Sequence, residues 1–105
     1  MAIKSAAKIV VESLAVNGVE TLFCLPGIQN DPFFAALYDS EIKAINARHE
    51  QGVAYMALGA ALATGKPQGF AVVPGPGFLN TTSALATAYA TGAPVFCLAG
   101  EVATS

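Results

Sequence analysis

The sequence predicts an α/β fold built around one parallel sheet with helices on both faces. Four strand-like segments alternate with four segments of helical periodicity, and each strand follows a helix. Three of the strand segments are almost entirely apolar, as expected for parallel strands that are buried on both faces. Strands that alternate with helices need right-handed crossovers, which place the helices on the two faces of the sheet.

The helical segments are recognised by their apolar spacing and by the residues at their ends. Residues 3–16 end at Asn17-Gly18, a common left-handed stop, and the next helix begins with an N-cap and a proline at Asp31-Pro32 and ends near Ser40. Residues 51–64 are apolar nearly all round, which predicts burial on more than one side. We expect strands at residues 21–25, 43–47, 70–73 and 95–99, a rigid turn at residues 74–77 and a last helix at residues 80–91.

Length and composition restrict the class of protein. The 105 residues form one small domain, and 54% hydrophobic against 11% charged residues excludes disorder and predicts apolar surface that a partner covers. Five basic and seven acidic residues are scattered along the chain, so there is no basic stripe for nucleic acid. Nucleic acid is therefore not an expected partner.

No residue from 67 to 100 is charged, but this stretch is too interrupted for a membrane helix. Proline and glycine divide it at residues 74–77 and 92–94, so we interpret it as protein core. The first ten residues carry Lys4 and Lys8 and lack the apolar run of a secretory signal. The expected location is the cytoplasm.

The two cysteines, Cys24 and Cys97, lie in apolar strand segments far apart in the sequence. Neither belongs to a Cys-x-x-Cys motif or lies near a cluster of His or Asp. We expect buried structural thiols, with no metal site and no disulfide.

The last strand segment, residues 95–99, is as apolar as an interior strand of a parallel sheet. Only five residues follow Gly100, too few for a covering helix. We therefore expect that residues 1–105 are the N-terminal part of a longer domain, or that another chain completes the sheet.

Ligands of open parallel sheets bind at the carboxyl ends of the strands, where Glu50 follows the second strand. Position alone favours a structural role for Glu50, as an acid in the first helical turn that complements the helix dipole. His49 is likewise more typical of a hydrogen-bonded structural group than of a catalyst.

The turn Pro74-Gly75-Pro76-Gly77 lets a backbone approach a ligand closely, although a stiff connection is an equally good interpretation. With Asn80 it comes close to the dinucleotide fingerprint, but the third glycine is missing. Binding of a nicotinamide or flavin dinucleotide, with Glu101 as the more distant acid, remains an alternative.

Taken together, these motifs resemble the N-terminal pyrimidine-binding domain of the thiamine diphosphate-dependent family that contains acetolactate synthase, benzaldehyde lyase and 2-oxo acid decarboxylases. The resemblance covers nearly the whole chain, and its motifs occur in the family's order and spacing. They lie at residues 18–23, 26–27, 48–54, 56–57, 63–67, 75–77, 80, 86–90, 94–95 and 99–100.

The resemblance implies a three-layer α/β/α fold with the strand order 2-1-3-4. It also implies that Glu50 hydrogen-bonds N1′ of the cofactor's aminopyrimidine and promotes the imino tautomer that removes the thiazolium C2 proton. Pro26 and Gly27, together with Gly75, Pro76 and Gly77, would shape the pocket near the pyrimidine. Asn80 is expected to brace the turn.

The family's Gly-Asp-Gly…Asn-Asn segment, which holds Mg²⁺ and the diphosphate, does not occur in these residues. Because the family builds each site between two subunits, the resemblance implies self-association or a diphosphate-domain partner, a 2-oxo acid or aldehyde substrate, and no activity of this chain alone. FAD is possible in the parent enzyme. Leu58, Ala60 and Glu101 depart from the family pattern, and a non-catalytic dimerisation or regulatory module remains an alternative.

Overall fold

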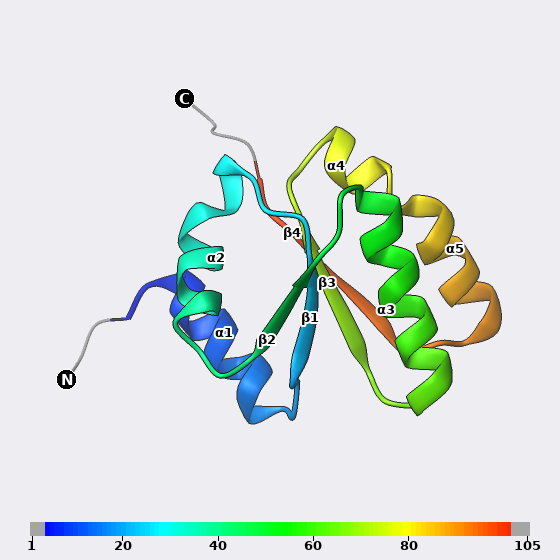
Figure 1. Ribbon diagram of the computed structural model, residues 1–105, viewed down its shortest axis with the longest axis horizontal. Helices are drawn as coiled ribbons and strands as arrows, with labels where there is room; N and C mark the ends of the chain where they lie inside the picture. Colours follow the sequence, from blue (N-terminus) through cyan, green and yellow to red (C-terminus); the bar gives the residue numbers. More distant parts are fainter. Residues whose placement is uncertain (1–3, 102–105) are drawn as a thin grey trace.

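The computed structural model describes residues 4–101, which form a four-stranded parallel sheet between two layers of helices (Figure 1). The strand order is β2-β1-β3-β4, so the predicted fold class and the predicted order 2-1-3-4 are both confirmed. The strands are β1 (Thr21–Cys24), β2 (Lys43–Asn46), β3 (Gln68–Val72) and β4 (Val95–Ala99). The helices are α1 (Ala6–Val16), α2 (Asp31–Tyr38), α3 (Glu50–Thr64), α4 (Pro76–Leu79) and α5 (Thr82–Thr91), with a 3₁₀ helix at Ile28–Asn30.

Each face of the sheet has its own hydrophobic core. Helices α1 and α2 cover one face, and α3 and α5 cover the other, as the two sides of Figure 1 show. The alternation along the two central strands produces this division: Leu22 and Cys24 of β1 contact the α1/α2 side, while Phe23 contacts the α3/α5 side. Both central strands are therefore buried on both sides, which explains their continuous apolar sequence.

Helix α1 ends at the predicted stop, with Asn17 as its C-cap and Gly18 at φ 84°. The prediction of Asp31 as an N-cap was wrong, because Asp31 is already the first residue of α2 and Asn30 precedes it as the cap. Gly65 and Gly92 end α3 and α5 in the left-handed conformation, with φ angles of 71° and 70°. The predicted start of the first helix at Ile3 lies outside the described residues.

The predicted rigid turn at residues 74–77 was wrong in its second half. Pro76 begins the short helix α4, because its ring fixes φ at a helical value, and Gly75 makes the turn before it with φ 70°. The predicted helix from Asn80 accordingly starts later, at Thr82. The 3₁₀ helix at Ile28–Asn30 was not predicted either.

Within residues 4–101, β4 is an edge strand that pairs with β3 alone. Phe96 extends its ring over Gly69 of β3, where a Cβ atom would overlap the ring. The residues of β4 from Val95 to Leu98 are only half-buried. That a further strand or another chain continues the sheet stays a prediction.

Cys24 is buried in the central strand and Cys97 is half-buried in the edge strand, and both are free thiols. Burial raises the pKa of Cys24 from 9.0 to about 12 and that of Cys97 to about 11, because the thiolate loses its hydration. Both side chains are therefore neutral at ordinary pH. None of the helices within residues 4–101 has the length and hydrophobicity needed to cross a membrane.

Candidate functional site

The loops that follow β1, β2 and β3 meet at the carboxyl end of the sheet, at the top of Figure 1. They carry the seven residues that sequence considerations assigned to the cofactor site. These residues are Pro26 and Gly27 after β1, Glu50 after β2, and Gly75, Pro76, Gly77 and Asn80 after β3. Parallel pairing of the three strands is what brings the loops to one edge.

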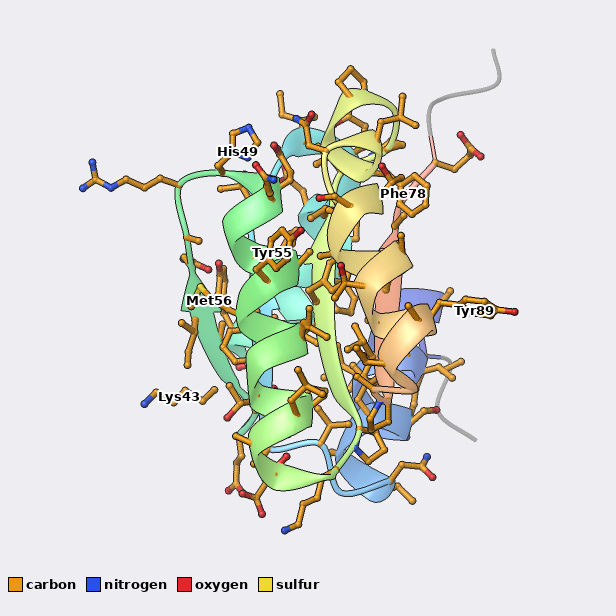
Figure 2. All side chains as sticks on the ribbon, turned by 90° about the vertical axis from the view of Figure 1, so that its right-hand side faces the viewer. Lys43, His49, Tyr55, Met56, Phe78 and Tyr89 are labelled. Atoms are coloured by element: carbon orange, nitrogen blue, oxygen red, sulfur yellow. The ribbon has the colours of Figure 1, made fainter. Side chains whose placement is uncertain are left out.

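Glu50 is the first residue of α3, and His49 immediately before it is the N-cap. His49 has an extended backbone, with φ −151° and ψ 144°, and its ring Nδ1 accepts a hydrogen bond of 3.0 Å from the backbone N–H of Gln51. Figure 2 shows His49 at the upper end of α3. The structural interpretation of His49 is thus supported, and because Nδ1 is the acceptor, the proton of the neutral ring is on Nε2.

Asn80 joins the loop after β3 to the start of α3. Its side-chain Nδ2 donates a hydrogen bond of 3.2 Å to Oε1 of Glu50, across a separation of 30 residues. Asn80 is also the C-cap of α4. The side chain that was expected to brace the turn therefore contacts the candidate catalytic carboxylate directly.

Gly77 lies beside the second carboxylate oxygen of Glu50 and contributes no side chain there. A Cβ atom at Gly77 would lie 3.7 Å from Oε2 of Glu50 and only 2.7 Å from Cγ2 of Val73. Within residues 4–101 no donor to Oε2 is found, whereas Oε1 is held by Asn80. The half-buried Glu50 thus has one oxygen bonded to Asn80 and one oxygen that lies near Gly77 and makes no hydrogen bond within the described residues.

Val73, which was not predicted, connects two of the predicted glycines. Its Cγ1 methyl occupies the space that a Cβ atom at Gly27 would need, and its Cγ2 methyl limits Gly77 in the same way. No local pattern distinguishes Val73 from the rest of its apolar run, so it could not be found from the sequence. The predicted residues Pro26, Gly75 and Pro76 are exposed at the same edge of the sheet.

Asn30 is a second residue that sequence considerations missed. Its buried side chain donates a hydrogen bond of 2.7 Å to the carbonyl oxygen of Val72, so it ties the loop after β1 to the end of β3. Its Oδ1 atom occupies the space that a Cβ atom at Gly100 would need. Asn30 thereby holds three strand ends in place without facing the Glu50 carboxylate.

A hollow of about 330 Å³ lies beside the turn after β3. It is lined by Pro74, Gly75, Phe78, Ala99, Gly100 and Glu101. Glu101, which departs from the family pattern, thus lies at the ends of β3 and β4, next to Gly75.

The fold defines an α/β domain with a parallel sheet, and comparison with known proteins identifies its family. Residues 4–105 match the model of the thiamine pyrophosphate enzyme N-terminal TPP binding domain, and the chain belongs to this family. The predicted resemblance is confirmed. The family is one that binds thiamine diphosphate.

Similar proteins include acetolactate synthases. The chain is 41% identical over 98 residues to a probable acetolactate synthase large subunit of Methanocaldococcus jannaschii, covering 93% of this chain, and 44% identical over 96 residues to an acetolactate synthase of Bacillus subtilis, covering 91%. It is 37% identical over 94 residues to a probable 2-ketoarginine decarboxylase of Pseudomonas aeruginosa, covering 90%. In each case the matched region spans 17% of the relative's length.

Proposed function

We propose that this domain binds the aminopyrimidine ring of thiamine diphosphate through Glu50 and supplies that half of the cofactor site to an enzyme acting on 2-oxo acids. The observation that carries the proposal is the arrangement of one carboxylate. Asn80 holds Oε1 of Glu50, and Oε2 lies near Gly77, which has no side chain.

The residues at this edge fit a flat heteroaromatic ring. Gly77 presents bare backbone next to Oε2, so a ring can come within hydrogen-bonding distance of the carboxyl group. A carboxyl group can share one proton with a ring nitrogen, since it accepts when ionised and donates when protonated. Gly27 and Val73 pack against each other behind this surface, so the wall next to the ring is rigid.

Thiamine diphosphate, when bound, supplies the electron sink that allows a bond next to a carbonyl group to break. The role of Glu50 would be to hold the proton shared with the pyrimidine nitrogen at Oε2. His49 would keep the first turn of α3 closed by capping Gln51, so that Glu50 leaves the helix in a fixed direction. Pro26, Gly75 and Pro76 would line the rim of the pocket.

We propose that the diphosphate and its Mg²⁺ are bound by a different domain or chain. Within residues 4–101 no group of three or more His, Cys, Asp or Glu is arranged to hold a metal ion. The relatives that this chain matches extend well beyond the shared region, so there is room in them for such a domain. An acetolactate synthase and a probable 2-ketoarginine decarboxylase are both among these relatives, which supports a 2-oxo acid as substrate.

Exposed apolar side chains on α3 and α5 support the proposal that a partner covers this side of the domain. Leu62 is 57% exposed and Tyr89 is 92% exposed. Figure 2 shows Tyr89 pointing away from α5 into solvent, Tyr55 between α3 and α5, and Met56 on the side of α3 next to β2. A non-catalytic module would use the same surface, so the two proposals differ only in what Glu50 does.

The test replaces Glu50 by Gln in the intact protein that carries this domain and measures hydrogen–deuterium exchange at C2 of bound thiamine diphosphate. We expect exchange to slow by about 100-fold or more, since general acid–base groups contribute about 10²- to 10⁴-fold. Glu41→Gln is the matched control, because Glu41 is an exposed acid before β2, at the opposite end of the sheet. Unchanged exchange in Glu50→Gln would leave the module as the better explanation, and calorimetry with NAD would test the dinucleotide alternative.

A further inference from the structure

We propose that Asn80 is a positioning residue for Glu50 and that it determines which carboxyl oxygen carries the proton. The inference rests on the proposed function of Glu50 and deepens it. Its basis is the hydrogen bond of 3.2 Å from Nδ2 of Asn80 to Oε1 of Glu50.

The turn around Asn80 does not need the Asn80 side chain. The backbone N–H of Asn80 donates to the carbonyl oxygen of Pro76 at 3.0 Å, and the next N–H, of Thr81, donates to that of Phe78 at 2.9 Å. The buried hydroxyl of Thr81 donates to the same Phe78 oxygen at 2.6 Å. These three bonds close the end of α4, so the Asn80 amide is available for Glu50.

Glu50, in turn, does not need Asn80 to start its helix. His49 already caps α3 through Gln51, and an acid in the first turn complements the helix dipole wherever its carboxylate points. A bond from a residue 30 positions away restricts the direction of the side chain and adds little else. The simplest explanation of this contact is that it aims the carboxyl group.

The chemistry of the amide then selects the oxygen. A side-chain NH₂ group only donates, so Oε1 must be an acceptor as long as the bond exists. Because the carbonyl oxygen of a carboxyl group is a better acceptor than its hydroxyl oxygen, this bond favours the proton on Oε2, the oxygen that lies near Gly77. Without Asn80 the proton would be shared between both oxygens and the group would rotate freely.

Substitutions at Asn80 separate this role from a turn-forming one. Asp has the same shape and the same preference for turns as Asn but cannot donate, whereas Gln keeps the amide donor on a longer side chain. If Asn80 positions Glu50, C2 exchange and calorimetric affinity for thiamine diphosphate should fall in the order Asn80→Gln, Asn80→Ala, Asn80→Asp, with exchange in the last reduced by about 10- to 100-fold. If Asn80 only forms the turn, Gln, which does not favour turns, should be tolerated no better than Ala.

A double-mutant cycle with Glu50→Gln tests whether Asn80 acts through Glu50. We expect Asn80→Ala to slow exchange in the native background and to have no further effect when Glu50 is Gln. Asn17→Ala is the matched control, because Asn17 is also a helix C-cap, and its Nδ2 bonds only the local carbonyl of Ser13 at 2.8 Å.

The possible failures are distinguishable. Wild-type affinity and exchange in Asn80→Asp, together with a large loss in Glu50→Gln, would overturn the positioning role and leave the proposed function intact. Equal effects of Asn80→Ala in the native and Glu50→Gln backgrounds would likewise overturn the positioning role and leave the proposed function intact. Unchanged exchange in Glu50→Gln would overturn the proposed function itself, and the positioning role with it.

Discussion

Replacing Gly77 by Ala tests the steric arrangement on which the candidate site depends. The new Cβ atom would lie 2.7 Å from Cγ2 of Val73, well inside van der Waals contact. Val73 also packs against Gly27 through its other methyl group, which limits how far it can turn away from Gly77. A β-branched side chain has few alternative rotamers, so the strain falls on the backbone of the loops.

The expected magnitude follows from two opposing effects. Overpacking of a single methyl group costs about 1–3 kcal/mol. A Gly to Ala change within a helix contributes up to about 1 kcal/mol of stability, but α4 has only four residues, so little of that is realised. We therefore expect Gly77→Ala to lower the free energy of unfolding by about 1–2 kcal/mol.

Urea unfolding of the intact protein measures this change, and Gly59→Ala is the control. Gly59 is an exposed residue of α3, and a Cβ atom added there would have no other atom within 4 Å, so Ala should stabilise by about 0.5–1 kcal/mol. Adding Val73→Ala to Gly77→Ala should relieve the overlap, so the two effects should not be additive. A Gly77→Ala protein as stable as Gly59→Ala would refute the packing argument.

Two further predictions concern the cap of α3 and the buried thiols. His49→Ala should lower the free energy of unfolding by about 1 kcal/mol, because the backbone N–H of Gln51 loses its hydrogen-bond partner, while His49→Asn should restore most of this loss. Thermal unfolding measures both variants, and a melting temperature of His49→Ala equal to that of the wild-type protein would contradict the cap. Stability should also fall as the pH rises above about 9 toward about 12. The unfolded thiols ionise near 9.0, whereas burial raises the pKa of Cys24 to about 12 and of Cys97 to about 11, so the unfolded state releases protons first. Urea midpoints at about pH 8 and about pH 10 measure this effect, and Cys24→Ala should reduce the difference between them.

The parts of the fold that could be predicted are those encoded by neighbouring residues. The apolar runs of β1 and β4 correspond to strands, β1 buried in the centre of the sheet and β4 half-buried at its edge, and their ends are marked by Pro26 and Gly100. The start of α4 was missed because Pro76 is equally suited to a turn and to a first helical turn.

The parts of the site that could not be predicted depend on contacts between distant segments. Asn30 and Val72 are 42 residues apart, and their hydrogen bond exists only because β1 and β3 are neighbours in the sheet. The packing of Val73 between two glycine-containing loops has the same origin. Local spacing carries no information on such pairs, so neither Asn30 nor Val73 could be separated from an ordinary loop or strand residue.

The two interpretations of Glu50, a helix-start acid and a cofactor acid, make different demands on its surroundings. A helix-start acid needs only its place in the first turn, and His49 already satisfies the free N–H of Gln51. A cofactor acid needs a fixed direction and an open approach to one oxygen. The hydrogen bond from Asn80 supplies the first and the bare backbone of Gly77 supplies the second. Because neither feature serves the helix, their presence at the same carboxylate favours the cofactor acid.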